Sequence, residues 1–457
     1  MGDFRALPSI DQLLQHPAAR DLVTRYGHGP TTSALRDAVG RARESLARTA
    51  GNAPAGLPDG PDALVAQAAG ALTAADRGRL VPVVNATGVV IHTNLGRAPL
   101  AARAVERIGE VARGYATLEY DLARGARGSR SVHAEGLLCA LTGAEAAVVV
   151  NNNAAAMLLV LGTLARGREV LISRGELVEI GGGFRVPDVM TQSGASLREV
   201  GTTNRTRLSD FTAAMGPATA LVLRVHPSNF RIEGFTEQPA LAAVVEAAHA
   251  AGVAVVEDLG SGNVDAASPW EPTVQASLAA GVDLVAVSGD KMLGGPQAGI
   301  ILGRKVLVDR LRAHPLMRAL RVDKLTYAAL EGTLLEHRAG RAHDTVPVLR
   351  MLHAPKVAVT ARADALAETL RARGWQATVI DGESAIGGGS APGVTVPTSL
   401  VRLAWPGWSA DRLEAWLRAR PTPIIARIQD GSVVLDLRTV AEADDAEVAA
   451  ALTAPTV

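Results

Sequence analysis

Lysine is scarce in this chain, and one lysine stands where a reactive amine would be useful. Of the 46 basic residues 42 are arginines, and the four lysines are Lys291, Lys305, Lys324 and Lys356. Lys291 follows an apolar run at Leu284–Val287 and a small polar turn, and a Gly-Gly-Pro loop comes after it. An amine in such a dry site has a lowered pKa and can form a Schiff base. Pyridoxal phosphate (PLP) is the cofactor that most often uses a lysine in this way, and a solvated loop lysine is the alternative.

Two further strand ends carry side chains that suit the same cofactor. The apolar run Ala146–Val150 ends at Asn151, Asn152 and Asn153, and a helix of small residues follows at once. Free N–H groups and the helix dipole make this turn a candidate phosphate site, with a plain helix cap as the alternative. Asp258 ends another apolar strand, where a carboxylate can pair with the pyridine nitrogen or merely cap a helix. The order of phosphate turn, aspartate and lysine favours a PLP enzyme.

The side chain that would stack on the cofactor ring is not fixed by the pattern. Arg174 follows the expected strand Glu169–Ile172 and is a candidate, and Glu176 or a backbone turn is another. The glycines at 181–183 lack the strand–turn–helix context of a dinucleotide site. His133 and His226 can line a pocket or serve as structural histidines. We expect no metal site, because no metal-binding spacing of histidine and cysteine stands out.

Several arginines form a second group with a common chemistry. Arg318 and Arg321 lie three apart on an expected helix and hence on one face. Arg97 and Arg130 lie in the runs NLGRAP and RGSR. Arginine forks suit phosphate and carboxylate. More than one such arginine indicates an anionic second substrate or a nucleic-acid backbone, and ordinary surface arginines are the alternative.

Composition limits the class of protein. The chain has 457 residues, of which 48% are hydrophobic and 20% charged, and its net charge is zero, as in a globular enzyme. Cys139 is the only cysteine, which excludes an intrachain disulfide and fits a reducing cytoplasm. Neither a signal peptide nor an apolar run of membrane-spanning length is visible, so we expect a cytoplasmic protein without a membrane partner.

The chain is expected to divide into four parts. Residues 1–50 form a small helical domain, with helices at Ile10–His16, from Pro17 to Arg25 and at Ser33–Ala50, the last capped by Thr31 or Thr32. Its third helix turns arginines outward. Residues 51–80 form a linker and one helix, residues 81–325 a large cofactor domain, and residues 326–457 a small α+β domain. The other strands expected in the two larger parts are Ser196–Val200, Ala220–Val225, Ala254–Glu257, Gly299–Leu302, Ala377–Ile380, Ser399–Ala404, Ile424–Ile428 and Ser432–Asp436. The helices expected there are Asn153–Ala165, Gln238–Ala251, Leu325–Ala339, Val357–Arg373 and Ala410–Arg418.

Strands alternate with helices through residues 146–302, which predicts an α/β fold with a mostly parallel central sheet covered on both faces. Ligands bind such sheets at the carboxyl ends of the strands. Lys291, Asp258 and the asparagine turn all follow strand ends, so the pattern places them together.

The motifs together resemble one family. The runs NATGVVIHTNLGRAPL, YDLARGARGSR, ISRGELVEIGGGFRVPDVM, GTTNRT, EDLGSG and SGDKMLGGPQAGII are similar to those of bacterial selenocysteine synthase, the L-seryl-tRNA(Sec) selenium transferase family. The resemblance extends to LPSIDQLLQHPAARDLVTRYG and to IGGGSAPG, so it covers nearly the whole chain. It implies the aspartate-aminotransferase type of fold, fold type I.

The resemblance also implies roles for single residues. Lys291 would hold PLP, and its neighbour Asp290 would matter for catalysis. Arg97, Arg318 and Arg321 would bind the anionic selenium donor, selenophosphate. Arg130 would lie near the seryl group.

The implied reaction converts L-seryl-tRNA(Sec) to L-selenocysteinyl-tRNA(Sec) through an aldimine and an aminoacrylyl intermediate. The N-terminal domain would hold the D-arm of tRNA(Sec), and the protein would form a homodecamer built from dimers. The alternatives are a PLP-dependent lyase or aldolase acting on a small amino acid or amino sugar, and an RNA-binding scaffold without catalysis. A small-substrate lyase has no need of the N-terminal domain, and a scaffold has no need of Asp258 and Lys291.

Overall fold

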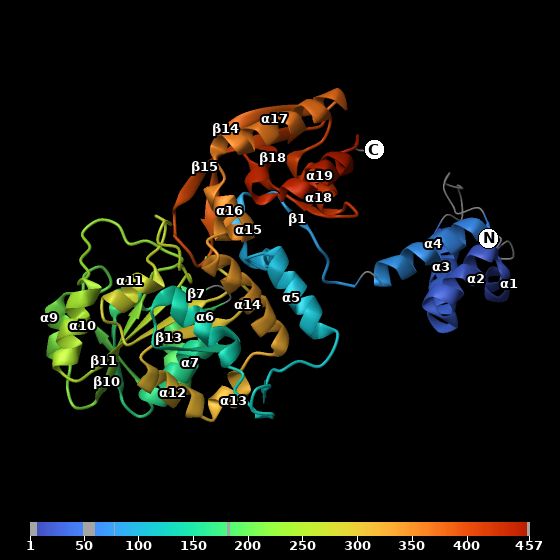
Figure 1. Cartoon of the computed structure of the whole chain (residues 1–457). Helices are drawn as coiled ribbons and strands as arrows, with labels where there is room; N and C mark the ends of the chain where they lie inside the picture. Colours follow the sequence, from blue (N-terminus) through green and yellow to red (C-terminus); the bar gives the residue numbers. More distant parts are fainter. Residues whose placement is uncertain (1–6, 49–59, 77, 181–182, 455–457) are drawn as a thin grey trace. The chain divides into compact units, whose positions relative to one another are not determined.

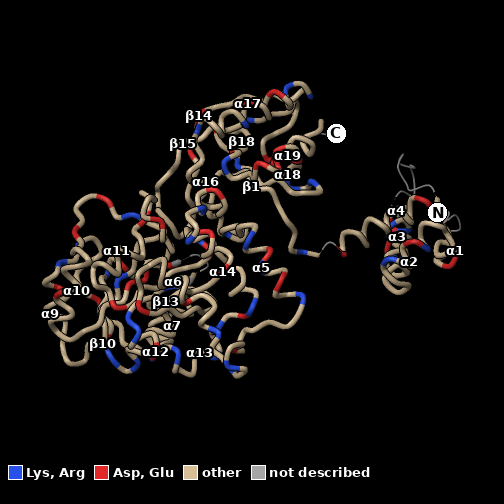
Figure 2. Tube along the Cα trace, in the orientation of Figure 1, with Lys and Arg blue, Asp and Glu red and all other residues tan. Residues whose placement is uncertain are grey.

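The computed structural model describes residues 7–48, 60–76, 78–180 and 183–454 (Figure 1). It divides into two compact units, Met1–Pro82 and Val83–Val457. Basic and acidic residues are distributed along the trace of both units (Figure 2), in keeping with the zero net charge. Over the described ranges, no helix has the length and apolar character that crossing a bilayer requires.

The first unit is a bundle of four helices: α1 (Ile10–Gln15), α2 (Pro17–Tyr26), α3 (His28–Arg48) and α4 (Pro61–Asp76). Their buried faces share one small core that includes Leu13, Leu35 and Leu64. The first two helices begin as expected, since Ser9 forms a capping box with Gln12 and Pro17 begins α2. Exposed arginines lie on α3 as expected: Arg36, Arg41 and Arg43.

The predicted start of the third helix is wrong. Helix α3 begins at His28, five residues before Ser33. Gly27, in the left-handed region with φ 87°, separates it from α2, and Pro30 falls in its first turn, where a missing N–H costs nothing. Thr31 does not cap this helix, because its hydroxyl donates back to the carbonyl of Gly27 at 2.8 Å.

The second unit is built on a seven-stranded sheet in the order β5-β13-β12-β11-β10-β6-β9. Four of its six pairings are parallel, and only β13 runs against its neighbours. This is the mostly parallel sheet that the sequence predicts. The strands are β5 (Ala146–Val150), β6 (Glu169–Ser173), β9 (Ser196–Val200), β10 (Thr219–Val225), β11 (Ala254–Gly260), β12 (Leu284–Ser288) and β13 (Gly299–Gly303).

Helices cover both faces of this sheet (Figure 1). Successive strand residues point to opposite faces, so Val149 packs into one core and Val148 into the other. The first core includes side chains from α6 (Val132–Thr142), α9 (Leu208–Ala214), α10 (Leu241–Ala250), α11 (Val274–Ala279) and α14 (Lys324–Arg338). The second includes side chains from α7 (Asn153–Leu164), α8 (Val186–Ser193), α12 (Lys305–Ala313) and α13 (Leu316–Leu320).

A second sheet has the order β17-β18-β15-β14-β2 and lies with the C-terminal helices. Its strands are β2 (Val89–Ile91), β14 (Gln376–Gly387), β15 (Thr395–Ala404), β17 (Arg427–Gln429) and β18 (Ser432–Asp436). Its core includes side chains from α17 (Lys356–Ala372), α18 (Ala410–Arg418) and α19 (Asp445–Ala451).

Two early strands belong with this C-terminal part. β2 pairs with β14, and β1 (Val84–Asn85) pairs with β16 (Ile424–Ile425). The short runs near residue 85 therefore lie beside elements more than 290 residues later in sequence, although the sequence places them at the start of the large domain. The division at residues 325 and 326 stays a prediction.

The remaining elements are short. Helix α5 (Ala102–Ala112) packs on α14, and α15 (Ala342–Thr345) and α16 (Pro347–His353) connect α14 to the C-terminal sheet. Two short hairpins are present, β3 (Tyr120–Asp121) with β4 (Ala126–Arg127) and β7 (Glu179–Ile180) with β8 (Phe184–Arg185). The described residues also form 3-10 turns at Thr93–Leu95, Arg174–Glu176, Leu437–Thr439 and Glu442–Asp444.

Candidate active site

Lys291 lies where the sequence places it, just past the carboxyl end of β12. Its side chain is 7% exposed, and its Nζ donates a hydrogen bond of 2.9 Å to the carbonyl of Gly389. Burial lowers the pKa of this amine, and the negative charge of Asp258 opposes that shift. A lowered pKa increases the fraction of neutral amine, which is the nucleophilic form.

Asp258 lies near the carboxyl end of β11, two residues before the strand ends at Gly260, and is buried beside β12. Its Oδ1 accepts a hydrogen bond of 2.7 Å from the side-chain amide of Asn153, at the start of α7. Burial raises the pKa of Asp258, while the Asn153 amide and the Lys291 charge lower it. The carboxylate therefore lies in a dry site with few donors, where a cationic partner would stabilise its charged form.

The asparagine turn is an N-terminal cap as well as a wall of the site. Asn152 caps α7 by accepting from the N–H of Ala155 at 2.9 Å. β13 passes so close to this turn that a Cβ on Gly299 would lie 2.1 Å from the carbonyl oxygen of Asn152. Asn151 does not line the cavity described next. Its backbone N–H donates a hydrogen bond to the carbonyl of Leu320.

A cavity of about 230 Å³ brings these residues together. Its walls include Asn152, Asn153, Asp258, Ser288, Asp290, Lys291, Gln297 and Arg97. Asn153 Oδ1 is buried there without a hydrogen-bond partner among the described residues. A primary amine, a buried carboxylate and the N-terminus of a 12-residue helix around one cavity fit the aldehyde, ring nitrogen and phosphate of PLP.

Asp290 and Arg97 form a charged pair on the wall of this cavity. Arg97 Nη1 lies 2.7 Å from Asp290 Oδ2, and the aspartate is buried. Arg97 has φ 63°, in the left-handed region that non-glycine residues rarely adopt. The backbone at Arg97 is therefore held in a strained conformation beside the residue that precedes Lys291.

The other three predicted arginines lie in a different cavity. Arg130, Arg318 and Arg321 line a hollow of about 440 Å³ that shares no lining residue with the Lys291 cavity. Glu119 pairs with two of these arginines: Arg130 Nε donates to its Oε1 at 2.9 Å, and Arg321 Nη1 donates to the same oxygen at 3.3 Å. These bonds hold the pKa of Glu119 below its usual value, with the Arg130 hydrogen bond the largest cause. A single chain thus does not assemble Arg97, Arg318 and Arg321 around one anion.

Arg174 is not brought to the cavity. It is exposed, and its Nε donates to Glu199 at 2.7 Å. Glu176, the other candidate, is buried against Arg224, with Oε1 accepting from Nε at 2.8 Å. Neither side chain lines the Lys291 cavity.

His226 does not line the Lys291 cavity and lies in a separate hollow with Trp270 and Glu271, although its backbone contacts Asp258. Its N–H donates to the carbonyl of Asp258 at 2.9 Å, and its Nε2 lies 2.8 Å from Glu271 Oε2. Burial is the largest single influence and lowers the pKa of His226, but the hydrogen bond to Glu271 and the negative charges of Glu271, Glu257 and Asp258 together leave the pKa raised. From the sequence, His226 was only one of two candidate histidines, because no motif or spacing connects it with Glu271, 45 residues later. His133 has a structural contact, with Nε2 3.1 Å from the carbonyl of Leu118.

Two further residues of the site were not predicted from the sequence, although both lie in motifs that resemble the family. Gln297, in SGDKMLGGPQAG, lines the cavity. Gly389, in IGGGSAPG, accepts the hydrogen bond of Lys291. The motifs marked these segments, but the fold was needed to show that residue 389 lies against residue 291.

The sheet order, with a buried aspartate and a buried lysine past adjacent strands, defines the class: the second unit has the fold-type I architecture of PLP-dependent enzymes. In agreement, D-glucosaminate-6-phosphate ammonia-lyase has a similar fold, with a TM-score of 0.58 and 22% identity over 82% of this chain and 95% of that one. The fold class predicted from the sequence is confirmed.

The family follows from sequence comparison. The family described as L-seryl-tRNA selenium transferase matches residues 83–441, and the one described as selenocysteine synthase N terminal matches residues 4–43. The L-seryl-tRNA(Sec) selenium transferase of Geobacter sulfurreducens is 47% identical over 461 residues, covering 99% of each chain. That of Rhizobium meliloti is 46% identical over 455 residues, covering 97% of this chain and 96% of its own. The chain belongs to the L-seryl-tRNA selenium transferase family, which confirms the resemblance stated above.

Proposed function

We propose that this protein converts L-seryl-tRNA(Sec) to L-selenocysteinyl-tRNA(Sec), with selenophosphate as the selenium donor and PLP as the cofactor. The observation that carries the proposal is similarity over nearly the full length to transferases of that name. The buried Lys291 amine and Asp258 carboxylate, at one cavity, support the cofactor. The reaction replaces the β-hydroxyl of the serine with selenium and releases phosphate.

The residues of the cavity would divide the work of holding PLP. Lys291 would carry the aldehyde carbon, Asp258 would pair with the ring nitrogen, and the turn at Asn152 and Asn153 would bind the phosphate through the start of α7. When bound, PLP supplies an electron sink for charge that develops at the serine α-carbon. Asn151 and Arg174 have no such place in this proposal, because neither lines the cavity.

Lys291 has the chemistry of the proton carrier. Its amine would take the proton from the serine α-carbon, because burial favours the neutral form that can accept a proton. Lys291 is 7% exposed, and at such burial its interaction with the Asp258 charge is stronger than it would be in water. Asp290 keeps Arg97 directed along the cavity wall through their 2.7 Å contact.

The arginines are proposed to recognise the anionic donor. Arg97 would bind selenophosphate at the Lys291 cavity, and Arg318 and Arg321 would bind it from the second cavity, with Arg130 near the seryl group. Because these cavities are separate within one chain, the proposal requires that a second copy supply one set of arginines. The exposed apolar side chains of Tyr115, Leu122 and Val132 support such an association, and a homodecamer built from dimers is the assembly we propose.

The first unit is proposed to bind tRNA(Sec). It has its own core and exposed arginines on α3. Arginine side chains suit phosphate backbones, and the D-arm is the proposed contact. A charged tRNA as substrate also implies a cytoplasmic location.

The decisive experiment is an assay with purified protein, seryl-tRNA(Sec) and selenophosphate, scored for selenocysteinyl product. We expect product from the wild type and none from Lys291→Ala. We also expect the visible absorbance band of a lysine-bound PLP in the wild type, removed by the same substitution. Absence of the band with PLP present would contradict the cofactor assignment.

Substrate controls separate this function from the alternatives. Free L-serine and an amino-sugar phosphate, each with the PLP-loaded enzyme, test for a small-substrate lyase. Ammonia release from either, without selenium incorporation into seryl-tRNA(Sec), would replace the proposed reaction with a lyase. Binding of tRNA(Sec) with no PLP band would instead indicate a scaffold.

A further inference from the structure

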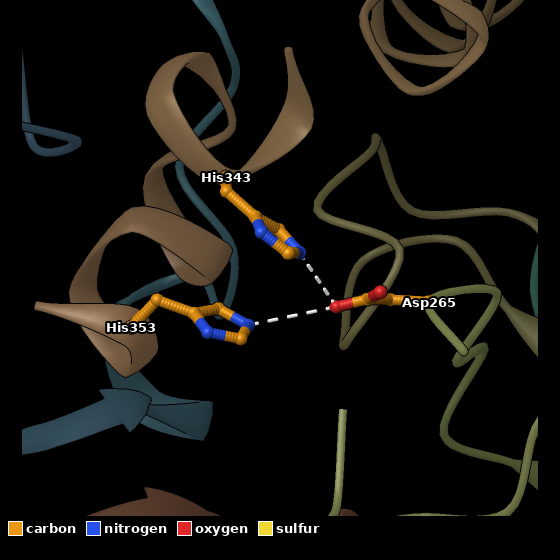
Figure 3. Close-up of side chains that lie close together, drawn as sticks. All are labelled: Asp265, His343 and His353. Carbon is orange, nitrogen blue, oxygen red and sulfur yellow. Dashed lines mark hydrogen bonds and ion pairs between the residues drawn. The ribbon is translucent and has the colours of Figure 1, made fainter. Parts of the chain in front are cut away.

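Three side chains outside both cavities converge on one point (Figure 3): Asp265, His343 and His353. Asp265 lies in the loop after β11, His343 lies in α15, and His353 ends α16. One ligand-type atom from each lies within 4.8 Å of the others. We call these three residues the histidine–aspartate cluster. None of them has a part in the proposed transferase chemistry.

Asp265 is oriented by its own loop. Its Oδ1 accepts from the N–H of Ala267 at 3.0 Å, and its own N–H donates to Asn263 Oδ1 at 3.0 Å. These contacts leave Oδ2 directed at the two histidines, as Figure 3 shows. A carboxylate fixed by such outer contacts is the usual form of a metal-binding carboxylate.

The imidazole rings are also fixed in place. The rings of His343 and His353 stack with centroids 4.1 Å apart and planes 24° apart. Trp270 contacts the His353 ring edge-on at 5.1 Å. Both Nε2 atoms face the same oxygen, at 2.7 Å for His343 and 3.5 Å for His353. His353 Nε2 is buried and lacks a hydrogen-bond partner among the described residues.

These distances are close to those of a ligand set. Ligand atoms at about 2.0–2.1 Å from a tetrahedral zinc ion lie about 3.3–3.4 Å apart. The His353 contact, at 3.5 Å, is close to that length, and the His343 contact, at 2.7 Å, would lengthen by less than about 1 Å when its proton is replaced by an ion. The side chain of His343 is 43% exposed, so an ion would approach from its side of the cluster and could retain water there as a further ligand.

Neighbouring histidines do not compete for the ion. His337, on α14, is engaged by the carbonyl of Leu293, 2.9 Å from its Nε2. His249 faces Asp283 at 2.8 Å, but that carboxylate is engaged by Arg304, and no second histidine joins it. Within the described ranges, the histidine–aspartate cluster is the one group of three or more such side chains that meets this geometry.

We propose that Asp265, His343 and His353 form a binding site for a divalent transition metal ion of the zinc class. Imidazole nitrogen and carboxylate oxygen are the ligands such ions accept, and water completes the coordination. The ion would join the loop that follows Asp258 to α15 and α16, which lead to the C-terminal sheet. Its effect would be to hold this junction of the second unit together.

Cobalt(II) is the probe, because its visible absorption changes when it is bound by nitrogen and oxygen ligands. The full-length protein is treated with a chelator, dialysed, and titrated with Co²⁺, and then with Zn²⁺ as competitor. We expect one Co²⁺ per chain at micromolar concentrations, displaced by Zn²⁺, and a metal-dependent rise in the unfolding temperature. The readout does not depend on transferase activity, so it stands whether or not the proposed function holds.

Substitutions locate the ion. We expect Asp265→Asn, His343→Gln and His353→Gln each to weaken Co²⁺ binding by at least about 10-fold, the cost typical of losing even an outer partner of a metal ligand. His249→Gln is the matched control, a histidine beside a carboxylate, and should bind Co²⁺ as the wild type does. Asp265→Asn keeps a side-chain oxygen that can accept the hydrogen bond from the Ala267 N–H. If this variant misfolds, Co²⁺ binding by the His343→Gln variant, which changes an exposed residue, tests the site.

Three outcomes would overturn the proposal. They are no saturable binding in the wild type, unchanged affinity in the three cluster variants, or an equal loss in His249→Gln. In the presence of chelator, His343→Gln and the wild type should unfold at the same temperature. This control shows that the variant is folded and that the substitution removes only the stabilisation by metal.

Discussion

The Lys291 amine donates a hydrogen bond to the carbonyl of Gly389, 98 residues later in the chain. Gly389 lies just after β14 in the C-terminal part, whereas Lys291 follows β12 of the central sheet. The reactive amine is therefore positioned by both parts of the second unit. Its correct placement depends on how the C-terminal part packs, as well as on its own strand.

A side chain at Gly389 is predicted to displace Lys291 from its place in the cavity. A Cβ there would lie 2.6 Å from Lys291 Nζ, and its φ is 85°, in the region that favours glycine. We expect Gly389→Ala to lower PLP loading and activity strongly, measured by the lysine-bound absorbance band and by product formation.

Gly407→Ala is the matched control for that substitution. Gly407 has φ 77°, and a Cβ there would meet nothing within 4 Å. Both variants pay a backbone cost of about 1–2 kcal/mol, seen in denaturant unfolding. If Gly407→Ala loses the absorbance band as fully as Gly389→Ala does, the loss results from general instability and not from contact between the new side chain and Lys291.

Stability of the cofactor-free protein should depend on pH through Lys291. Because burial lowers the pKa of this amine from its ordinary value of 10.5, the unfolded chain binds the proton more readily than the folded chain. Unfolding free energy therefore rises with pH between the lowered pKa and 10.5. Lys291→Met removes this rise. Urea midpoints of both proteins across the alkaline range test it, and parallel pH curves would contradict it.

The sequence was informative about local elements and less so about partners. The strands Ala146–Val150, Ser196–Val200 and Ser432–Asp436 have the predicted bounds. The first is a continuous apolar run that ends at polar residues, whereas Ser196–Val200 (SLREV) carries polar side chains between Leu197 and Val200. Lys291 and Asp258 could be placed together because both follow parallel strands, which end at one edge of a sheet. These inferences need only the order of residues along the chain.

The remainder depends on packing between distant segments. Strand β2 has three residues, so its apolar pattern cannot show that it pairs with β14. Arg174 looked suitable because it follows a strand, but a long side chain can turn outward, here to Glu199. His343 and Asp265 lie 78 residues apart, and no spacing rule connects them. The start of α3 was misplaced because proline is compatible with a first helical turn.

Arg318 is predicted to serve the selenium donor and not the cofactor. It lines the second cavity with Arg130 and Arg321, away from Lys291. A charge-assisted hydrogen bond contributes about 1.5–3 kcal/mol, so Arg318→Ala should lower kcat/KM for selenophosphate about 10- to 100-fold. The PLP band should be unchanged.

Arg310→Ala is the control for Arg318→Ala. Arg310 lies on α12, is exposed, and does not line the second cavity. We expect it to keep both the PLP band and full selenium incorporation. Equal loss of PLP binding and of selenium incorporation in Arg318→Ala would indicate misfolding and remove the assigned role.

The N-terminal unit should be separable from catalysis only when it is removed whole. Leu64 on α4 shares a core with Leu35 on α3, so deletion of residues 1–50 alone would expose the apolar face of α4. Deletion of residues 1–82 removes the complete unit. We expect this deletion to leave the PLP band intact and to weaken tRNA(Sec) binding at least about 10-fold, since several phosphate contacts are lost.

Gel-shift titration measures the affinity for tRNA(Sec). A folded variant with Arg36, Arg41 and Arg43 changed to alanine should also bind tRNA(Sec) more weakly. An unchanged affinity in the deletion protein would show that tRNA is bound by the second unit.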